Sequence, residues 1–194
     1  ARYLFNQILN AYETLQSAGI CHRDMSLENI LLDTNGSGIV IDLGMCFKIP
    51  YGNGYDADQS MTTRAMDRRH QQRFLIAPDR SCGKPYYTAP EIRRSQEPFD
   101  GHAIDIWAAG PILFLLVTGF PPWEHASLDD ERFRIFSSGG LVEVLNSWNL
   151  GTRISPDVMD LLQRMFFLDP RDRLGLNQIR AHPWMSGPMN PPRC

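Results

Sequence analysis

The sequence shows no surplus of basic charge and no long hydrophobic run. Its 194 residues have a formal net charge of −3, whereas nucleic acids and anionic membranes usually bind proteins with a clear basic excess. We therefore expect neither partner. The most apolar stretch, residues 106–120, contains glycine and proline and is shorter than the roughly 20 residues that cross a bilayer. It predicts a buried central helix.

Cysteine is also scarce. The four cysteines show no Cys-x-x-Cys spacing and no accompanying zinc-type histidines, which indicates a reduced, intracellular protein, and we expect it in the cytoplasm. No initiator methionine and no signal-type pattern precede the first helical segment, so we expect a truncated piece of a longer protein. The composition, 43% hydrophobic and 21% charged, predicts one globular domain. It does not predict an oligomeric state.

Apolar spacing predicts a mainly α-helical fold with a small β-hairpin. Apolar residues recur at helical spacing over residues 4–15. Short apolar runs at 30–32 and 39–41 predict two strands, and Asn35-Gly36 predicts the tight turn between them. Periodicity vanishes from 48 to 81, which predicts a loop that is either functional or disordered. The remaining pattern is helical.

Two short motifs flank the predicted hairpin. Residues 22–29 read His-Arg-Asp-Met-Ser-Leu-Glu-Asn, and residues 42–44 read Asp-Leu-Gly. Together they resemble the catalytic loop and the magnesium-binding loop of eukaryotic protein kinases. The two aspartates are 42 − 24 = 18 positions apart, the arrangement by which that family faces two carboxylates across one cleft.

The resemblance implies roles for individual residues in ATP-dependent phosphorylation of a protein substrate. Asp24 would be the catalytic base, Asp42 would chelate the Mg²⁺ on the ATP phosphates, and Asn29 would bind a second Mg²⁺. Leu31 would belong to the nucleotide site, and Leu43 would pack on His22. The alternative is that the polar residues are ordinary turn formers.

Three further motifs extend the resemblance over about residues 4–185. Residues 83–91, Gly-Lys-Pro-Tyr-Tyr-Thr-Ala-Pro-Glu, resemble the peptide-docking loop of the family. Glu91 and Arg173 would form a buried bridge, Asp105 would anchor the catalytic loop, and His22 would also be structural. The resemblance implies a protein-kinase-like large (C-terminal) lobe over residues 1–186, a helical bundle with a small β-hairpin sheet, followed by a flexible tail, 187–194.

The chain departs from the family pattern at two positions. Serine/threonine kinases usually have a lysine two residues after the catalytic aspartate, and this position is Ser26. They usually have threonine or serine after the glycine of the docking loop, and this position is Lys84. We interpret this as a compensated exchange, in which Lys84 reaches Asp24 and the phosphate and Ser26 supplies the hydroxyl. The alternative is two independent changes.

The segment between Asp42 and Glu91 is long for the activation segment of a kinase. By the resemblance, Arg23 is the phosphate receiver of that segment. A phosphorylated hydroxyl could order the segment against Arg23, and the alternative is a solvated basic loop without a regulatory role. The candidate phosphorylation sites are Ser60, Thr62, Thr63 and Ser81.

No glycine-rich loop and no strand lysine precede His22, and those parts grip ATP in the family. We therefore expect the small lobe to lie in the missing part of the parent chain and residues 1–194 to be inactive alone. The acceptors are expected to be serine or threonine, and the overall look is loosely similar to the calcium/calmodulin-dependent kinase group. The alternative is a pseudokinase, a scaffold that presents the helical lobe to partners.

Overall fold

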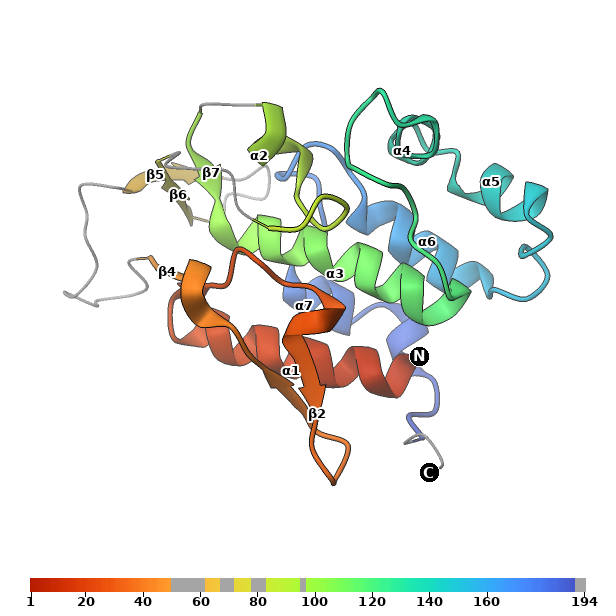
Figure 1. Ribbon diagram of the computed structural model, residues 1–194, viewed down its shortest axis with the longest axis horizontal. Coiled ribbons are helices and arrows are strands. Elements are labelled where there is room, and N and C mark those ends of the chain that lie inside the picture. Colours follow the sequence, from red (N-terminus) through yellow and green to blue (C-terminus); the bar gives the residue numbers. More distant parts are fainter. Residues whose placement is uncertain (50–61, 67–71, 78–82, 95–96, 191–194) are drawn as a thin grey trace.

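One long apolar helix, α3 (Gly101–Thr118), organises the fold. The computed structural model describes residues 1–49, 62–66, 72–77, 83–94 and 97–190. Within them α3 packs between α1 (Arg2–Ser17) and α6 (Pro156–Met165) (Figure 1). The Asp100 carboxylate caps α3 by accepting the N–H groups of its first turn, and Gly119, with φ of 88°, ends the helix.

Helix α3 confirms the predicted buried central helix, although it begins earlier than the apolar run suggested. Among the described helices it alone has the length and hydropathy to cross a membrane, but the fold buries 72% of it, which is typical of a core helix. The remaining described helices are shorter than α3, and three single 3-10 turns occur elsewhere in the described part of the chain. They are α2 (Pro90–Arg94), α4 (Glu131–Ser137), α5 (Leu141–Ser147) and α7 (Leu176–Arg180), with turns η1 (Leu27–Asn29), η2 (Leu43–Met45) and η4 (Pro183–Ser186).

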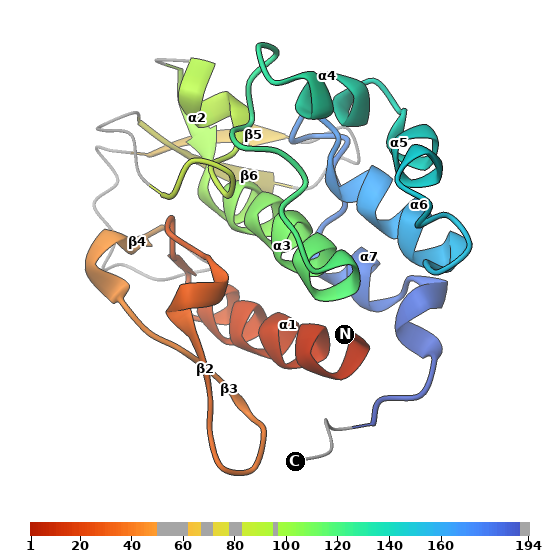
Figure 2. The same cartoon turned by 45° about the vertical axis from the view of Figure 1, so that its right-hand side comes forward.

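The predicted hairpin is confirmed. Strands β2 (Ile30–Leu32) and β3 (Gly38–Val40) pair antiparallel, with Leu31 opposite Ile39. Gly36 takes the left-handed conformation, with φ of 79°, in the turn between them. The hairpin projects beyond α1 on one side of the molecule (Figure 2).

The prediction that residues 48–81 form an irregular loop is wrong in part. Strand β4 (Phe47–Lys48) ends there and pairs with β1 (Ile20–Cys21). Strands β5 (Thr62–Met66) and β6 (Gln72–Ile76) pair with each other, and β6 also pairs with β7 (Phe99–Asp100). The partners of β4 and β7 lie more than twenty positions away, so no local pattern predicts those two strands. Strands β5 and β6 are neighbours in the sequence, but Thr-Thr-Arg-Ala-Met and Gln-Arg-Phe-Leu-Ile show no regular alternation of apolar and polar residues.

Aromatic side chains fill the core between α3, α4 and α6. Trp107 and Trp123 are fully buried, with ring centroids 5.7 Å apart. Phe166 lies 4.8 Å from Trp123, and Phe133 lies 5.1 Å from it. Edge-to-face contacts of this kind stabilise a core beyond the burial of apolar area. This packing confirms the interpretation of these tryptophans as core residues rather than ligand-binding ones.

Candidate active site

The segment 22–29 is held from below by a buried carboxylate on α3. Asp105, only 2% exposed, accepts the backbone N–H of His22 at 2.7 Å and that of Arg23 at 2.8 Å. Burial raises the pKa of Asp105 to about 7, while the two backbone hydrogen bonds act in the opposite direction. Asp105 therefore fixes the start of the segment 22–29 to the buried helix α3.

His22 joins the two motifs. Its Nδ1 accepts the N–H of Asp24 at 3.3 Å, so Nε2 carries the proton and donates to the carbonyl oxygen of Ile41 at 3.1 Å. Burial lowers the pKa of His22, which favours this neutral form, whereas the charges of Asp24 and Asp42 both act to raise it. Both carboxylates therefore lie within electrostatic reach of one imidazole.

Asp24 and Asn29 are in direct contact. The Asn29 side-chain amide donates to the carbonyl oxygen of Asp24 at 2.7 Å and to its Oδ2 at 3.3 Å. Within the described part of the chain, the buried Oδ1 of Asp24 has no hydrogen-bond partner. In the base candidate, Asn29 thus braces one carboxylate oxygen, and the other oxygen is buried.

A backbone hydrogen bond places the residue before Asp42 next to Asn29. The N–H of Ile41 donates to the carbonyl oxygen of Asn29 at 2.9 Å, which brings the two segments together. Asp42 has φ of 63° and Arg23 has φ of 70°, both in the left-handed region. For residues other than glycine this conformation is strained, and such strain clusters at functional sites.

The donor set suits a magnesium ion held jointly with a phosphate ligand. The Asn29 amide nitrogen makes both contacts to Asp24. The amide oxygen accepts no hydrogen bond from the described residues. Asp42 is exposed, and the Gly44 N–H at 3.4 Å is a weak partner for its Oδ1. No cluster of three His, Cys, Asp or Glu side chains occurs in the described ranges. One carboxylate and one amide oxygen fit Mg²⁺, which usually takes its other ligands from water and substrate phosphates.

Leu31 and Leu43 face outward. Leu31 is 51% exposed and Leu43 is 59% exposed. The expected packing of Leu43 on His22 stays a prediction. The described hydrogen bonds that hold His22 run from its backbone N–H to Asp105 and from its ring to the carbonyl oxygen of Ile41. Leu31 lies on β2, two residues after Asn29.

Lys84 reaches from the docking segment, residues 83–91, to the catalytic loop, residues 22–29. Lys84 Nζ donates to Ser26 Oγ at 2.6 Å and lies 3.5 Å from Glu28 Oε2. Partial burial acts to raise the pKa of Glu28, but hydrogen bonds from its own backbone, Ser26 and Lys84 hold that pKa below its ordinary value. The sequence reasoning missed Glu28. Its opposite charge and its place two residues after Ser26 were the available signals.

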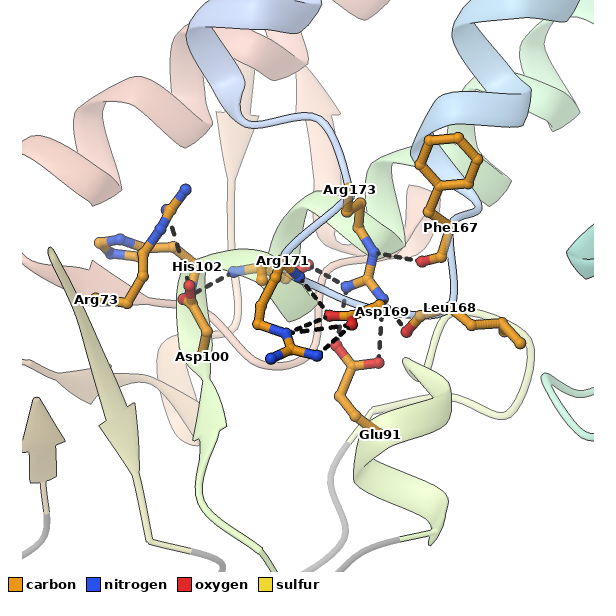
Figure 3. A network of polar contacts seen from close by, with 10 residues as sticks. Arg73, Glu91, Asp100, His102, Phe167, Leu168, Asp169, Arg171 and Arg173 are labelled. Carbon is orange, nitrogen blue, oxygen red and sulfur yellow. Dashed lines mark hydrogen bonds and ion pairs between the residues drawn. The ribbon is translucent and has the colours of Figure 1, made fainter. Parts of the chain in front are cut away.

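Glu91 and Arg173 form a buried ion pair (Figure 3). Arg173 Nη1 and Nη2 lie 2.8 and 3.1 Å from the two Glu91 carboxylate oxygens. The guanidinium also donates to the carbonyl oxygens of Ala103 at 2.9 Å and Phe167 at 3.2 Å. Its carbon lies 4.7 Å from the centre of the Trp107 ring. The pair thus ties α2 to both α3 and the loop before α7.

Comparison with known proteins agrees with this geometry. The protein kinase domain family matches residues 1–185. The chain belongs to the protein kinase family. The kinase named fatty acyl-CoA synthetase and RNA processing-associated kinase 1 of Saccharomyces cerevisiae is 34% identical over 184 residues, which are 94% of this chain and 18% of that protein.

Two other relatives are named as serine/threonine-protein kinases. CHK1 of Saccharomyces cerevisiae is 33% identical over 189 residues, 95% of this chain and 31% of the relative. SIK2 of Gallus gallus is 32% identical over 185 residues, 95% of this chain and 19% of the relative. This kinase chain therefore spans less than a third of the length of each of these relatives.

The predicted regulatory residues of the kinase are placed only in part. Ser60 and Ser81 lie outside the described residues. Thr62 and Thr63 lie on β5, with backbones paired to Ile76 and Leu75. Arg23 is 8% exposed, with its guanidinium carbon 6.0 Å from the centres of the Phe47 and Phe99 rings. The phosphate-receiving role of Arg23 stays a prediction.

Proposed function

We propose that this chain carries the phosphoryl-transfer loop and the protein-docking part of a serine/threonine protein kinase that uses ATP and Mg²⁺. The observation that carries the proposal is the contact of Asn29 with Asp24, together with the backbone hydrogen bond that ties the neighbour of Asp42 to Asn29. The Asn29 amide donates to Asp24 at 2.7 and 3.3 Å, and the N–H of Ile41 donates to the carbonyl oxygen of Asn29 at 2.9 Å. Mg-ATP, when bound, supplies the phosphoryl group and neutralises charge as it is transferred.

In this proposal each residue has one task. Asp24 orients the acceptor hydroxyl of the substrate and takes its proton on the carboxylate. Asn29 braces Asp24 through its amide nitrogen and offers its amide oxygen to a metal ion. Asp42 offers its carboxylate from the opposite segment. His22 and Asp105 position the loop and touch no substrate.

We further propose that residues 1–186 are the large lobe of the kinase, that 187–194 are a tail, and that a small lobe elsewhere in the parent protein completes the nucleotide site. The supporting observation is a set of exposed apolar side chains on the hairpin and just after it. Leu31 and Ile39 are cross-strand partners and are 51% and 48% exposed, and Leu32, Ile41 and Leu43 are 36% to 59% exposed. Exposed apolar side chains gathered in one region mark an interaction surface. Leu31 would then line the nucleotide site.

The proposal is tested with two lengths of the protein. The longest natural polypeptide that contains this chain is assayed with Mg-ATP and a generic protein substrate, beside residues 1–194 alone. We expect the longer form to phosphorylate serine or threonine and to lose on the order of 10²–10⁴-fold in kcat when Asp24→Asn is introduced. The 194-residue chain should show little activity. A longer form that binds Mg-ATP but phosphorylates nothing would instead indicate a scaffold.

A further inference from the structure

We propose that Lys84, delivered by the docking segment rather than by the catalytic loop, is the cation that stabilises the transferred phosphoryl group, and that Ser26 and Glu28 position its ammonium. This inference rests on the proposed kinase function. It replaces the expectation that Lys84 contacts Asp24 directly, because the described hydrogen bond of Lys84 Nζ runs to Ser26.

The docking segment lies directly against the base candidate. Gly83 has φ of 88°, and a Cβ atom there would lie 3.3 Å from the Arg23 carbonyl oxygen and 3.9 Å from Asp24 Oδ1. The backbone that precedes Lys84 therefore touches the residue that would accept the proton. Only a glycine adopts this conformation without strain at so close an approach.

The backbone of Lys84 is firmly held. Its carbonyl oxygen accepts the N–H groups of Tyr87 and Thr88, each at 3.0 Å, and the Thr88 hydroxyl at 2.9 Å. The Tyr87 hydroxyl in turn accepts the N–H of Leu27 at 3.3 Å. Three donors on one carbonyl and a tie to the catalytic loop fix where the lysine side chain begins. At the other end of the side chain, Ser26 Oγ positions the ammonium at 2.6 Å. A cation placed before the reaction is what electrostatic stabilisation of a transition state requires.

The ammonium group keeps capacity for a further contact. A lysine has three N–H donors, and the described contacts of Lys84 Nζ are Ser26 Oγ at 2.6 Å and Glu28 Oε2 at 3.5 Å. The Lys84 side chain is 37% exposed, so one donor can reach a bound phosphate. The carboxylates of Asp24 and Glu28 repel such an anion, so the Lys84 cation beside them favours its approach.

Ser26 and Lys84 depend on each other sterically and electrostatically. Ser26 is fully buried, and its hydroxyl receives the Lys84 ammonium. A lysine at position 26 would bring a second ammonium against the first, and the two charges would repel. Conversely, losing the lysine at position 84 leaves the site without this cation. The geometry therefore couples the two positions, whereas two independent changes would leave them uncoupled.

The test is a double-mutant cycle in the longest natural polypeptide that contains this chain, with wild type, Ser26→Lys, Lys84→Thr and the double variant. We expect each single change to lower kcat on the order of 100-fold with little change in the KM for the protein substrate. The double variant should recover at least about tenfold over either single variant. The proposal would be overturned if the loss of kcat in the double variant equals the product of the losses in the two single variants. A change in KM without a change in kcat would also overturn it.

A binding measurement gives a second readout that does not depend on turnover. The preference for a non-hydrolysable ATP analogue over ADP, both with Mg²⁺, is measured by calorimetry for wild type, Lys84→Met and Lys48→Met. The chain has only two lysines, and Lys48 on β4 is the matched control, exposed and outside the site. We expect Lys84→Met to lower the preference about tenfold or more and Lys48→Met to leave it unchanged.

The two readouts separate the failure of this inference from that of the proposed function. A wild-type protein that phosphorylates nothing refutes the proposed function, yet a preference lost in Lys84→Met still supports the phosphate contact. A wild-type protein that is active while Lys84→Met keeps both kcat and preference refutes the inference alone. Because Ser26→Lys changes a buried position, Lys84→Met also decides the matter if that variant does not fold.

Discussion

Two ion pairs connect the docking segment and the helix that follows it to the rest of the kinase, and they differ in almost every physical respect. The Arg173 and Glu91 side chains are 1% and 15% exposed, and the contact is bidentate. The Lys84 and Glu28 side chains are 37% and 55% exposed, and a single contact of 3.5 Å joins them. One segment is thus held by a buried pair at its end and touched by an exposed pair near its start.

The difference separates an ion pair that stabilises the fold from a charged side chain that can bind a substrate. A buried guanidinium whose donors all have acceptors cannot exchange partners without a large loss of stability. An exposed ammonium gains little from its carboxylate and can exchange partners freely. The first arrangement suits a structural tie, and the second suits a residue that meets a substrate. The following changes break or sharpen this contrast.

Breaking the buried pair should have the largest effect. Arg173→Met removes the cation and leaves the Glu91 carboxylate and the carbonyl oxygens of Ala103 and Phe167 without their donor. We expect the free energy of unfolding to fall by about 3–5 kcal/mol. Urea denaturation of residues 1–194 followed by circular dichroism measures this change.

Arg171→Met is the matched control for that experiment. Arg171 is two residues away and pairs with Asp169 at 2.6 Å, but its side chain is 58% exposed. We expect its denaturation midpoint to equal that of the wild type within error, because exposed pairs contribute little. Equal losses in both variants would show that burial does not set the strength of these pairs.

Replacing Asp105, the buried carboxylate that holds the start of the catalytic loop, should have an intermediate effect on stability. Asp105→Asn keeps one acceptor oxygen, so one of the N–H groups of His22 and Arg23 loses its partner. We expect a loss of roughly 1–3 kcal/mol in the free energy of unfolding near pH 8. Thermal unfolding of both proteins at that pH measures it.

The pH dependence of the same pair of proteins tests the burial of Asp105. Burial raises the pKa of Asp105 to about 7, whereas an unfolded aspartate titrates near about 3.9. Between these values the native state binds more protons, so this group makes stability fall as pH rises from about 4 to 7. The stability advantage of the wild type over Asp105→Asn should therefore shrink across that window. A constant difference would contradict the shift.

The sequence predicted those parts of the fold whose signals are local. The hairpin turn at Asn35-Gly36, the apolar run of α3 and the motif of the catalytic loop are each readable from neighbouring residues. The contact of Asn29 with Asp24 also follows from a short loop. The pairing of β6 with β7 does not, because it joins residues more than twenty positions apart and lacks an alternating pattern.

The site shows the same division. Position alone suggested that Lys84 and Ser26 are related, but the motif could not tell that the ammonium contacts the hydroxyl rather than the Asp24 carboxylate. It also did not predict the contact of Glu28 with Lys84, because an acidic residue in a loop is usually solvated surface and its charge alone is a weak signal. Leu43 is an apolar residue expected to pack on His22, and its side chain is 59% exposed. We propose that another lobe covers this part of the molecule.

Removing the exposed pair should have the smallest effect on stability. Glu28→Gln keeps the shape of the side chain and removes its charge, while Lys84 retains Ser26. We expect the free energy of unfolding to change by less than about 1 kcal/mol, and any difference from wild type to vanish in 1 M NaCl, where the Debye length is about 3 Å. Parallel urea titrations at low and high salt measure both quantities. A salt-independent loss as large as that of Arg173→Met would mean that the Lys84 ammonium is a fixed structural tie and is not free to meet a phosphate.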